Sequence, residues 1–186
     1  CSAYSRSAAF YTTGYAPCVD ATRSQLFIDD EIIEHQTLLE WVVHQPSRPR
    51  DNPVLRPEKL WEGGSIGFCA GVYHLPESGV YRMWYACMGA ELGGYRAYIC
   101  VADSDDGVHW RRPELDLYEV TDEPSNIVWA TDKKLDGPTV LHDTADPDHP
   151  WKLIFYRDGS VFVGTSVDGL RWDNPGDADR PVLPEF

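Results

Sequence analysis

The sequence has little positive charge and no long apolar run. It carries 16 Lys and Arg against 30 Asp and Glu, which gives a formal charge of −14, and no basic cluster interrupts the acidic excess. Nucleic acid is bound mainly through cationic contacts to phosphate, so we expect no nucleic-acid partner. No stretch approaches the roughly 18 apolar residues of a membrane span. No basic start followed by an apolar block is visible either, so a signal peptide is not indicated and the cellular compartment stays open.

Metal-binding patterns are also lacking. The five cysteines form no C-x-x-C pair and meet no cluster of histidines, so we expect no metal site. Their odd number argues against a complete disulfide framework. Cys69, Cys87 and Cys100 lie in apolar runs, where a small buried side chain is the ordinary role.

What the sequence does contain is a series of short apolar segments. With 186 residues, 42% of them hydrophobic and 12% aromatic, the chain can bury a sizeable core. Runs rich in Val, Ile, Tyr, Phe and Trp alternate with turn clusters, which predicts antiparallel strands joined by hairpins. The segment 26–45 fits helical and strand periods equally, and we favour strands there. The clearest predicted strands cover 72–75, 81–88, 97–103, 138–143, 151–158 and 160–166.

One turn is written twice. VADSDDGVHWRRP (Val101–Pro113) and VGTSVDGLRWDNP (Val163–Pro175) share the run S-x-D-G-x-x-W. The Asp can accept hydrogen bonds from its own backbone, the Gly tolerates positive φ, and the Trp can pack between sheets. We therefore predict that this motif is a structural hairpin turn without a chemical role.

The repeat extends well beyond this turn. NPVLRPEKLWEG, from Asn52, aligns with NIVWATDKKLDG, from Asn126, and RPVLPEF starts a third copy at Arg180. Units of about four strands, at a period somewhat above the roughly 40 to 50 residues of familiar propeller repeats, predict an all-β fold of four-stranded antiparallel propeller blades. We assign 1–25 to an N-terminal tail and 26–186 to a partial β-propeller, with blade units of about 52–125 and 126–179. These two to two and a half blades are expected to be completed by further C-terminal blades or by another chain.

The S-x-D-G-x-x-W turns, the YRMWY strand and the blade start NPVLRPEKLWEG resemble the five-bladed glycoside hydrolase superfamily. That group includes fructan hydrolases and invertases, arabinanases and xylosidases, and mannoside phosphorylases. The resemblance spans about 26–186 and implies a five-bladed propeller that acts on a carbohydrate substrate. It further implies an axial funnel in which carboxylates from the innermost strands act without a redox cofactor. The turn differs from the sialidase Asp-box, because one residue is missing between Asp and Gly.

The resemblance implies candidate catalytic residues, because glycoside cleavage needs two carboxyl groups. Asp136, in KLDGPTVLHD, stands where the family's R-D-P aspartate precedes the innermost strand of the second blade; its alternative role is that of a turn residue before Gly137. Glu62, in LWEGG, aligns with Asp136 in the repeat. The family's first-blade Asp would stand in GFCAG, which has none. Either Glu62 replaces it, or the machinery differs, or the domain binds sugar without cleaving it.

Further side chains are candidates for contacts with substrate. Trp61, beside Glu62, offers a face for stacking on a sugar ring, and Arg157 and Asp158, in FYRDG, could reach a sugar from a hairpin. Three functions therefore remain open. The first is a glycosidase, the second is a non-catalytic carbohydrate-binding or scaffold propeller, and the third is a glycoside phosphorylase. A phosphorylase needs a phosphate pocket, for which Arg96 and Arg157 are the candidates.

Overall fold

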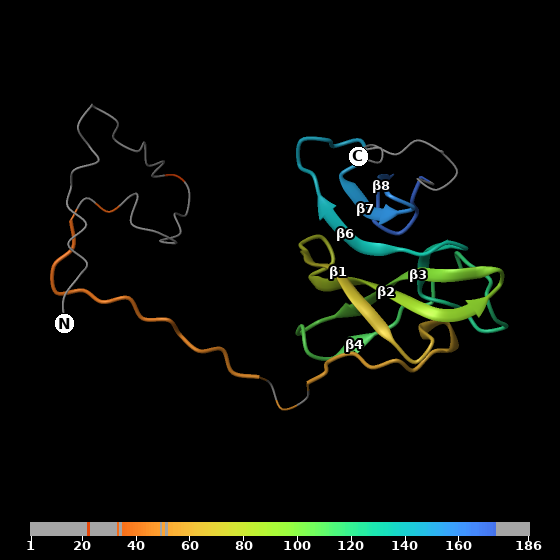
Figure 1. Ribbon diagram of the computed structural model, residues 1–186, viewed down its shortest axis with the longest axis horizontal. Helices are drawn as coiled ribbons and strands as arrows, with labels where there is room; N and C mark the ends of the chain where they lie inside the picture. The colour runs from red at the N-terminus through yellow and green to blue at the C-terminus, as the bar shows by residue number, and fades with distance from the viewer. Residues whose placement is uncertain (1–21, 23–32, 34, 49, 51, 174–186) are drawn as a thin grey trace. The chain divides into compact units, whose positions relative to one another are not determined.

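The computed structural model describes residues 22, 33, 35–48, 50 and 52–173 (Figure 1). The chain divides into two units, residues 1–47 and 48–186. The described residues of the first unit contain no helix or strand, and apolar side chains there are open to solvent: Leu38 is 100% exposed and Val43 is 79% exposed. The strands expected in 26–45 are therefore wrong for 33 and 35–45, and the remaining positions lie outside the described residues. An isolated strand pair has no apolar layer to stabilise it.

The first sheet of the second unit is an antiparallel meander. A short 3-10 helix, η1 (Leu60–Glu62), precedes it. Four consecutive strands then pair in chain order, each with the next. They are β1 (Ile66–Leu75), β2 (Val80–Leu92), β3 (Tyr95–Ser104) and β4 (Trp110–Arg111).

The second sheet repeats this plan. Its three strands, again antiparallel and in chain order, are β6 (Asp136–His142), β7 (Trp151–Arg157) and β8 (Ser160–Ser166). A single bridge from Thr165 to Asp173 stands where β4 stands in the first sheet, beside the last strand. The six strands predicted between residues 72 and 166 are confirmed, and the fold is all-β with antiparallel blades, as in part of a β-propeller.

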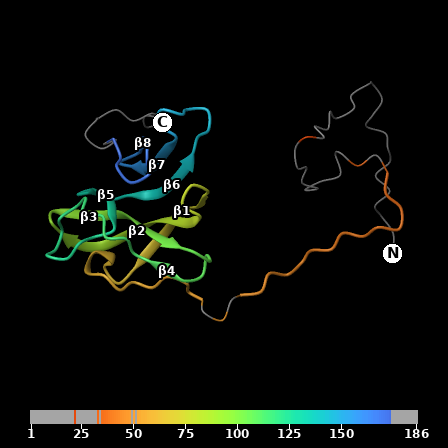
Figure 2. The same cartoon turned by 180° about the vertical axis from the view of Figure 1, so that it is seen from behind.

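The strand β5 (Ile127–Thr131) connects the two repeats. It belongs by sequence to the start of the second repeat, yet it pairs with β3 of the first sheet, from Ala97 opposite Thr131 to Cys100 opposite Ile127. Figure 2 shows β5 lying beside β3. The outer edge of the first sheet is therefore shared between β4 and β5.

The two S-x-D-G-x-x-W turns have the same hydrogen bonds. In the first, Gly107 N–H donates to Ser104 Oγ at 2.9 Å, and Asp106 Oδ1 accepts from two backbone N–H groups at 2.8 Å. In the second, Gly169 N–H donates to Ser166 Oγ at 2.9 Å, and the Asp168 carboxylate again accepts two bonds at 2.8 Å. Both glycines have positive φ, 76° and 70°. The structural role predicted for the turn is confirmed.

Two apolar clusters hold the sheets. The first joins both sheets, with Trp84 and Ile99 on one side and Leu153 and Phe155 on the other. The second lies on the opposite face of the first sheet, where Trp61 covers residues of β2 and β3.

The cysteine prediction is only partly right. Cys87 and Cys100 are buried as predicted, with their sulfur atoms 3.8 Å apart. Cys69 is exposed. Strand side chains alternate between faces, and Ala70 takes the inward position beside it.

Candidate functional site

The first strands of the two sheets, β1 and β6, lie side by side. Tyr73 Oη donates a hydrogen bond of 3.2 Å to the Val140 carbonyl. A Cβ atom at Gly71 would lie 2.9 Å from the same oxygen, so only glycine permits this approach. β1 and β6 therefore have the arrangement expected of the innermost strands of neighbouring blades.

The strand registers show which residues are equivalent in the two sheets. Ser104 and Ser166 mark the same turn, and they pair with Tyr81 and Trp151, respectively. Tyr81 in turn pairs with His74 of β1, and Trp151 pairs with His142 of β6. The sheets can therefore be aligned residue by residue.

This alignment changes which residue of the first repeat is equivalent to Asp136. Asp136 pairs with Tyr156, and the equivalent pair in the first sheet joins Phe68 to Ala86. Phe68, in GFCAG, therefore occupies the inner-strand position of Asp136. Glu62 lies ahead of β1, on η1. The alignment of Glu62 with Asp136 was wrong because the first repeat has extra residues between Gly63 and its inner strand, as the printed sequence shows.

Asp136 is exposed at the start of β6. Its Oδ1 accepts a hydrogen bond of 2.8 Å from Gly137 N–H, and Gly137 has a φ of 52°. Beside it is an open depression of about 380 Å³, formed by the end of the β2–β3 hairpin and the connection from β5 to β6. Its lining residues are Met88, Glu91, Arg96, Ala97, Lys133, Lys134, Leu135 and Asp136.

Charged pairs surround this depression. Arg96 Nε lies 3.0 Å from Glu91 Oε1, and Lys133 Nζ lies 3.7 Å from Asp158 Oδ2. Glu91 is thus a second carboxylate of the depression that sequence reasoning missed. Its position directly before the L-G-G turn of a hairpin was the available signal, but a hairpin acid has many roles.

The two residues of the β7–β8 turn that were expected to contact sugar have different surroundings. Asp158 has a φ of 49° and a side chain that is 65% exposed, and its ion pair brings it close to the depression. Arg157 is only 4% exposed, with its guanidinium carbon 4.3 Å from the centre of the Phe162 ring. Its buried Nε has no hydrogen-bond partner within the described chain. A sugar contact by Arg157 would require the side chain to leave this ring.

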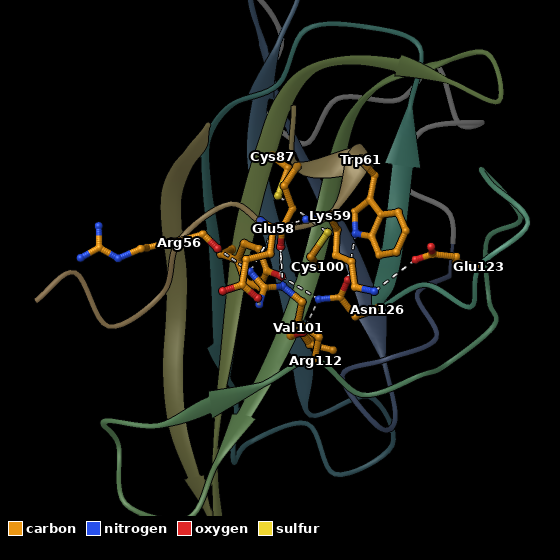
Figure 3. Close-up of polar contacts among 12 residues, drawn as sticks. Arg56, Glu58, Lys59, Trp61, Cys87, Cys100, Val101, Arg112, Glu123 and Asn126 are labelled. Carbon is orange, nitrogen blue, oxygen red and sulfur yellow. Dashed lines mark hydrogen bonds and ion pairs between the residues drawn. The ribbon is translucent and has the colours of Figure 1, made fainter. Parts of the chain in front are cut away.

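Glu62 lies elsewhere, in a network of polar contacts with Glu58, Lys59, Tyr85 and Arg112. Figure 3 shows Glu58, Lys59 and Arg112 of this network. Its Oε1 accepts from Tyr85 Oη at 2.8 Å and from Arg112 Nε at 2.7 Å. Its Oε2 accepts from the backbone N–H groups of Glu58 and Lys59, at 2.6 and 2.9 Å, and from Arg112 Nη2 at 3.1 Å. The side chain is 0% exposed.

These contacts fix the protonation state of Glu62. Burial raises the pKa of Glu62. The hydrogen bonds from Arg112, from the two backbone N–H groups and from Tyr85 together lower it by more than burial raises it, so the pKa lies below its usual value. The carboxylate is therefore ionised at neutral pH, and its bonds hold the segment before β1 against the first sheet. With five donors and no exposed surface, it is poorly placed to exchange a proton with a substrate.

Trp61 belongs to the same buried region. The ring is 1% exposed, and its Nε1–H donates to Asn126 Oδ1 at 2.9 Å. Asn126 Nδ2 donates to Tyr85 Oη and to the Val101 carbonyl, both at 2.7 Å. The stacking on sugar that was expected of Trp61 requires an exposed face, which the ring lacks here. The contacts that Arg112, Tyr85 and Asn126 make with Glu62 and Trp61 were not predicted from the sequence.

The comparisons with known proteins found little. No family model matches the chain, and no curated protein matches it. Among solved structures, it is similar to the crystal structure of a "putative glycoside hydrolase" from Bacteroides ovatus, with 18% sequence identity and a TM-score of 0.38. The similarity covers 66% of this chain and 36% of that protein.

Two further features are absent from the described residues. In that part of the chain, no helix is long and apolar enough to cross a membrane. The same residues include no group of three or more His, Cys, Asp or Glu side chains arranged to hold a metal ion.

Proposed function

We propose that the chain forms part of a propeller of the glycoside hydrolase type, and that the depression beside Asp136 binds a sugar of its substrate. The observation that carries this proposal is the position of Asp136, exposed at the start of an inner strand and at the wall of the depression. Met88 and Leu135 give that depression an apolar surface, and charged side chains surround it. A sugar ring, with an apolar face and a rim of hydroxyl groups, suits such a site.

Cleavage of a glycosidic bond needs a second carboxyl group. Glu91 lines the same depression as Asp136, whereas Glu62 is enclosed by its five donors. We therefore assign the acid and the nucleophile or base to Asp136 and Glu91 together. One group protonates the leaving oxygen while the other attacks the anomeric carbon or activates water. Glu62 has a structural role in this assignment.

One observation favours a second candidate function, a propeller that binds carbohydrate without cleaving it. The inner-strand position equivalent to Asp136 is held by Phe68 in the first sheet. An inner strand without an acid contributes nothing to proton transfer at the axis. Sugar binding around Asp136 alone is compatible with this arrangement.

The test separates the two functions. Binding of aryl glycosides and oligosaccharides is followed by calorimetry, and sugar release is followed by chromatography. The variants are Asp136→Asn and Glu91→Gln, and Asp132→Asn serves as a control because Asp132 is an exposed acid in the same connection that does not line the depression. We expect release to fall at least about 100-fold in the first two variants and to stay unchanged in the control. Binding that is weakened by Asp136→Asn without any release would favour the binding propeller, and the absence of both activities would overturn the proposal.

A further inference from the structure

The depression beside Asp136 has a charge balance unlike that of the chain as a whole. In the full sequence, 30 carboxylate side chains outnumber 16 Lys and Arg. Around the depression the order is reversed, because its lining has three cationic side chains and two carboxylates. They are Arg96, Lys133 and Lys134, and Glu91 and Asp136. The lining therefore carries an excess of one positive charge on a protein that is otherwise strongly acidic.

The excess charge belongs to Lys134. Arg96 is paired with Glu91, with 3.0 Å between the nearest nitrogen and oxygen. Lys133 faces Asp158 at 3.7 Å. Lys134 is exposed and forms no ion pair or hydrogen bond with any residue that the structure describes. An ammonium group has three donors and no acceptor, so the cation that is left at the depression is suited to an anionic ligand group.

A buried cation behind the depression preserves this excess. Asp158 would cancel it by pairing with Lys133 alone, but its Oδ2 also lies 3.9 Å from the Nε of Arg157. Arg157 is only 4% exposed, and this Nε has no hydrogen-bond partner within the described chain. One carboxylate thus lies between two cations, at distances too long for a hydrogen bond to either, and cannot neutralise both.

We propose that the sugar bound in the depression is an acidic one, and that its carboxylate pairs with Lys134. This inference rests on the proposed function, because it names the class of the sugar that the depression binds. A uronic acid has an apolar ring face, which suits the side chains of Met88 and Leu135. Its single negative charge matches the single excess cation.

The charges favour a carboxylate over other ligand groups. A neutral sugar leaves the excess charge unpaired. A phosphate group carries a charge of about −1.5 to −2 at neutral pH, which is more than one cation balances. Phosphate is also bound well by the two-pronged guanidinium of arginine. Here Arg96 is engaged by Glu91, and Arg157 lies over the Phe162 ring.

Pairs of ligands that differ in one charged group test the inference. Oligogalacturonides are compared with their methyl esters, and 4-nitrophenyl glucuronide with 4-nitrophenyl glucoside, by calorimetry. We expect the acidic member of a pair to bind about fivefold more tightly at about 50 mM NaCl, because the ion pair is formed at an exposed lysine. The preference should shrink at about 500 mM NaCl, because salt screens exposed charges.

Two variants separate Lys134 from other surface lysines. Lys134→Gln should remove the preference and leave the binding of the neutral member unchanged. Lys59→Gln is the matched control and should keep the preference, because the Lys59 side chain is 38% exposed and pairs with Glu123 outside the depression. Neither lysine is buried, so both variants should keep the wild-type Tm within about 2 °C.

The outcomes distinguish this inference from the proposed function. Neutral members that bind as tightly as the acidic ones would overturn the inference and leave the proposed function standing. Absence of binding by both members of every pair would overturn both. A preference that survives in Lys134→Gln would overturn the assignment to this lysine. Binding of neutral sugars that requires added inorganic phosphate would overturn the carboxylate in favour of a phosphate site.

Discussion

The two copies of the repeat differ most where their sequences seem to agree. Glu62 and Asp136 each precede a glycine of positive φ, Gly63 at 61° and Gly137 at 52°. Yet the first carboxylate is fully buried among five donors, whereas the second is exposed at the start of an inner strand. The extra residues between Gly63 and β1 separate the glycine from the strand that follows it. A repeated sequence preserved the local backbone conformation here, and the surroundings of the side chain changed.

The largest effect should come from replacing Glu62. Glu62→Gln removes the charge that faces Arg112, whose side chain is only 10% exposed. Breaking a buried ion pair on one side typically costs about 3–5 kcal/mol, and we expect a loss of unfolding free energy in this range. Urea unfolding measures it. Asp136→Asn is the matched control and should change stability by less than about 0.5 kcal/mol. Similar losses in both variants would remove the contrast between the two carboxylates.

A smaller contrast is expected between the two turn glycines. A Cβ atom at Gly107 meets nothing within 4 Å, whereas one at Gly169 would lie 2.8 Å from Trp84 Cζ2. Gly107→Ala therefore adds only the strain of a positive φ, about 1–2 kcal/mol. Gly169→Ala adds a clash between the sheets, typically about 1–3 kcal/mol more. Thermal unfolding of both variants gives the difference, and equal Tm values would show that the two sheets separate easily at this point.

The smallest expected effect is a change with pH in the loss of unfolding free energy that Glu62→Gln causes. The pKa of Glu62 lies below its usual value in the folded chain, so the folded state gains stability from this group once pH exceeds the unfolded pKa, about 4.3. The gain is lost as pH falls through the lower folded pKa. The stability difference between the wild-type protein and Glu62→Gln should therefore be constant above about pH 5 and shrink below about pH 4. Urea unfolding at pH 7, 5, 4 and 3 checks this. A difference that grows in acid would contradict the assigned direction.

The sequence was informative wherever structure is decided locally. The two S-x-D-G-x-x-W turns form their bonds within a few residues, so the motif predicted both conformation and role. The strands between the turns followed from short apolar runs. Segment 26–45 lacked this support, because its pattern fits two periods equally and no neighbouring layer could be identified from the sequence alone.

The candidate site was harder to predict because it depends on residues far apart in the chain. Arg112 reaches Glu62 across 50 positions, and Asn126 reaches Trp61 across 65. No spacing pattern encodes such pairs, so two residues that were expected to contact substrate proved to be parts of a buried support. Only the position of Asp136 at the start of its strand could be predicted, because a local motif marks it. Whether Asp136 contacts a sugar remains the proposal that its variant tests.

The strand β5 has a consequence for how such a protein can be divided or duplicated. The sequence repeat begins at Asn126, but the residues that follow it complete the edge of the preceding sheet through β3. The unit that repeats in the sequence is therefore not the unit that folds. A segment excised at the repeat boundary would take one strand from its neighbour and leave that sheet with an open edge. Backbone hydrogen bonds between β5 and β3 thus join the second repeat to the first, while the cysteines of the described residues, Cys69, Cys87 and Cys100, are all free.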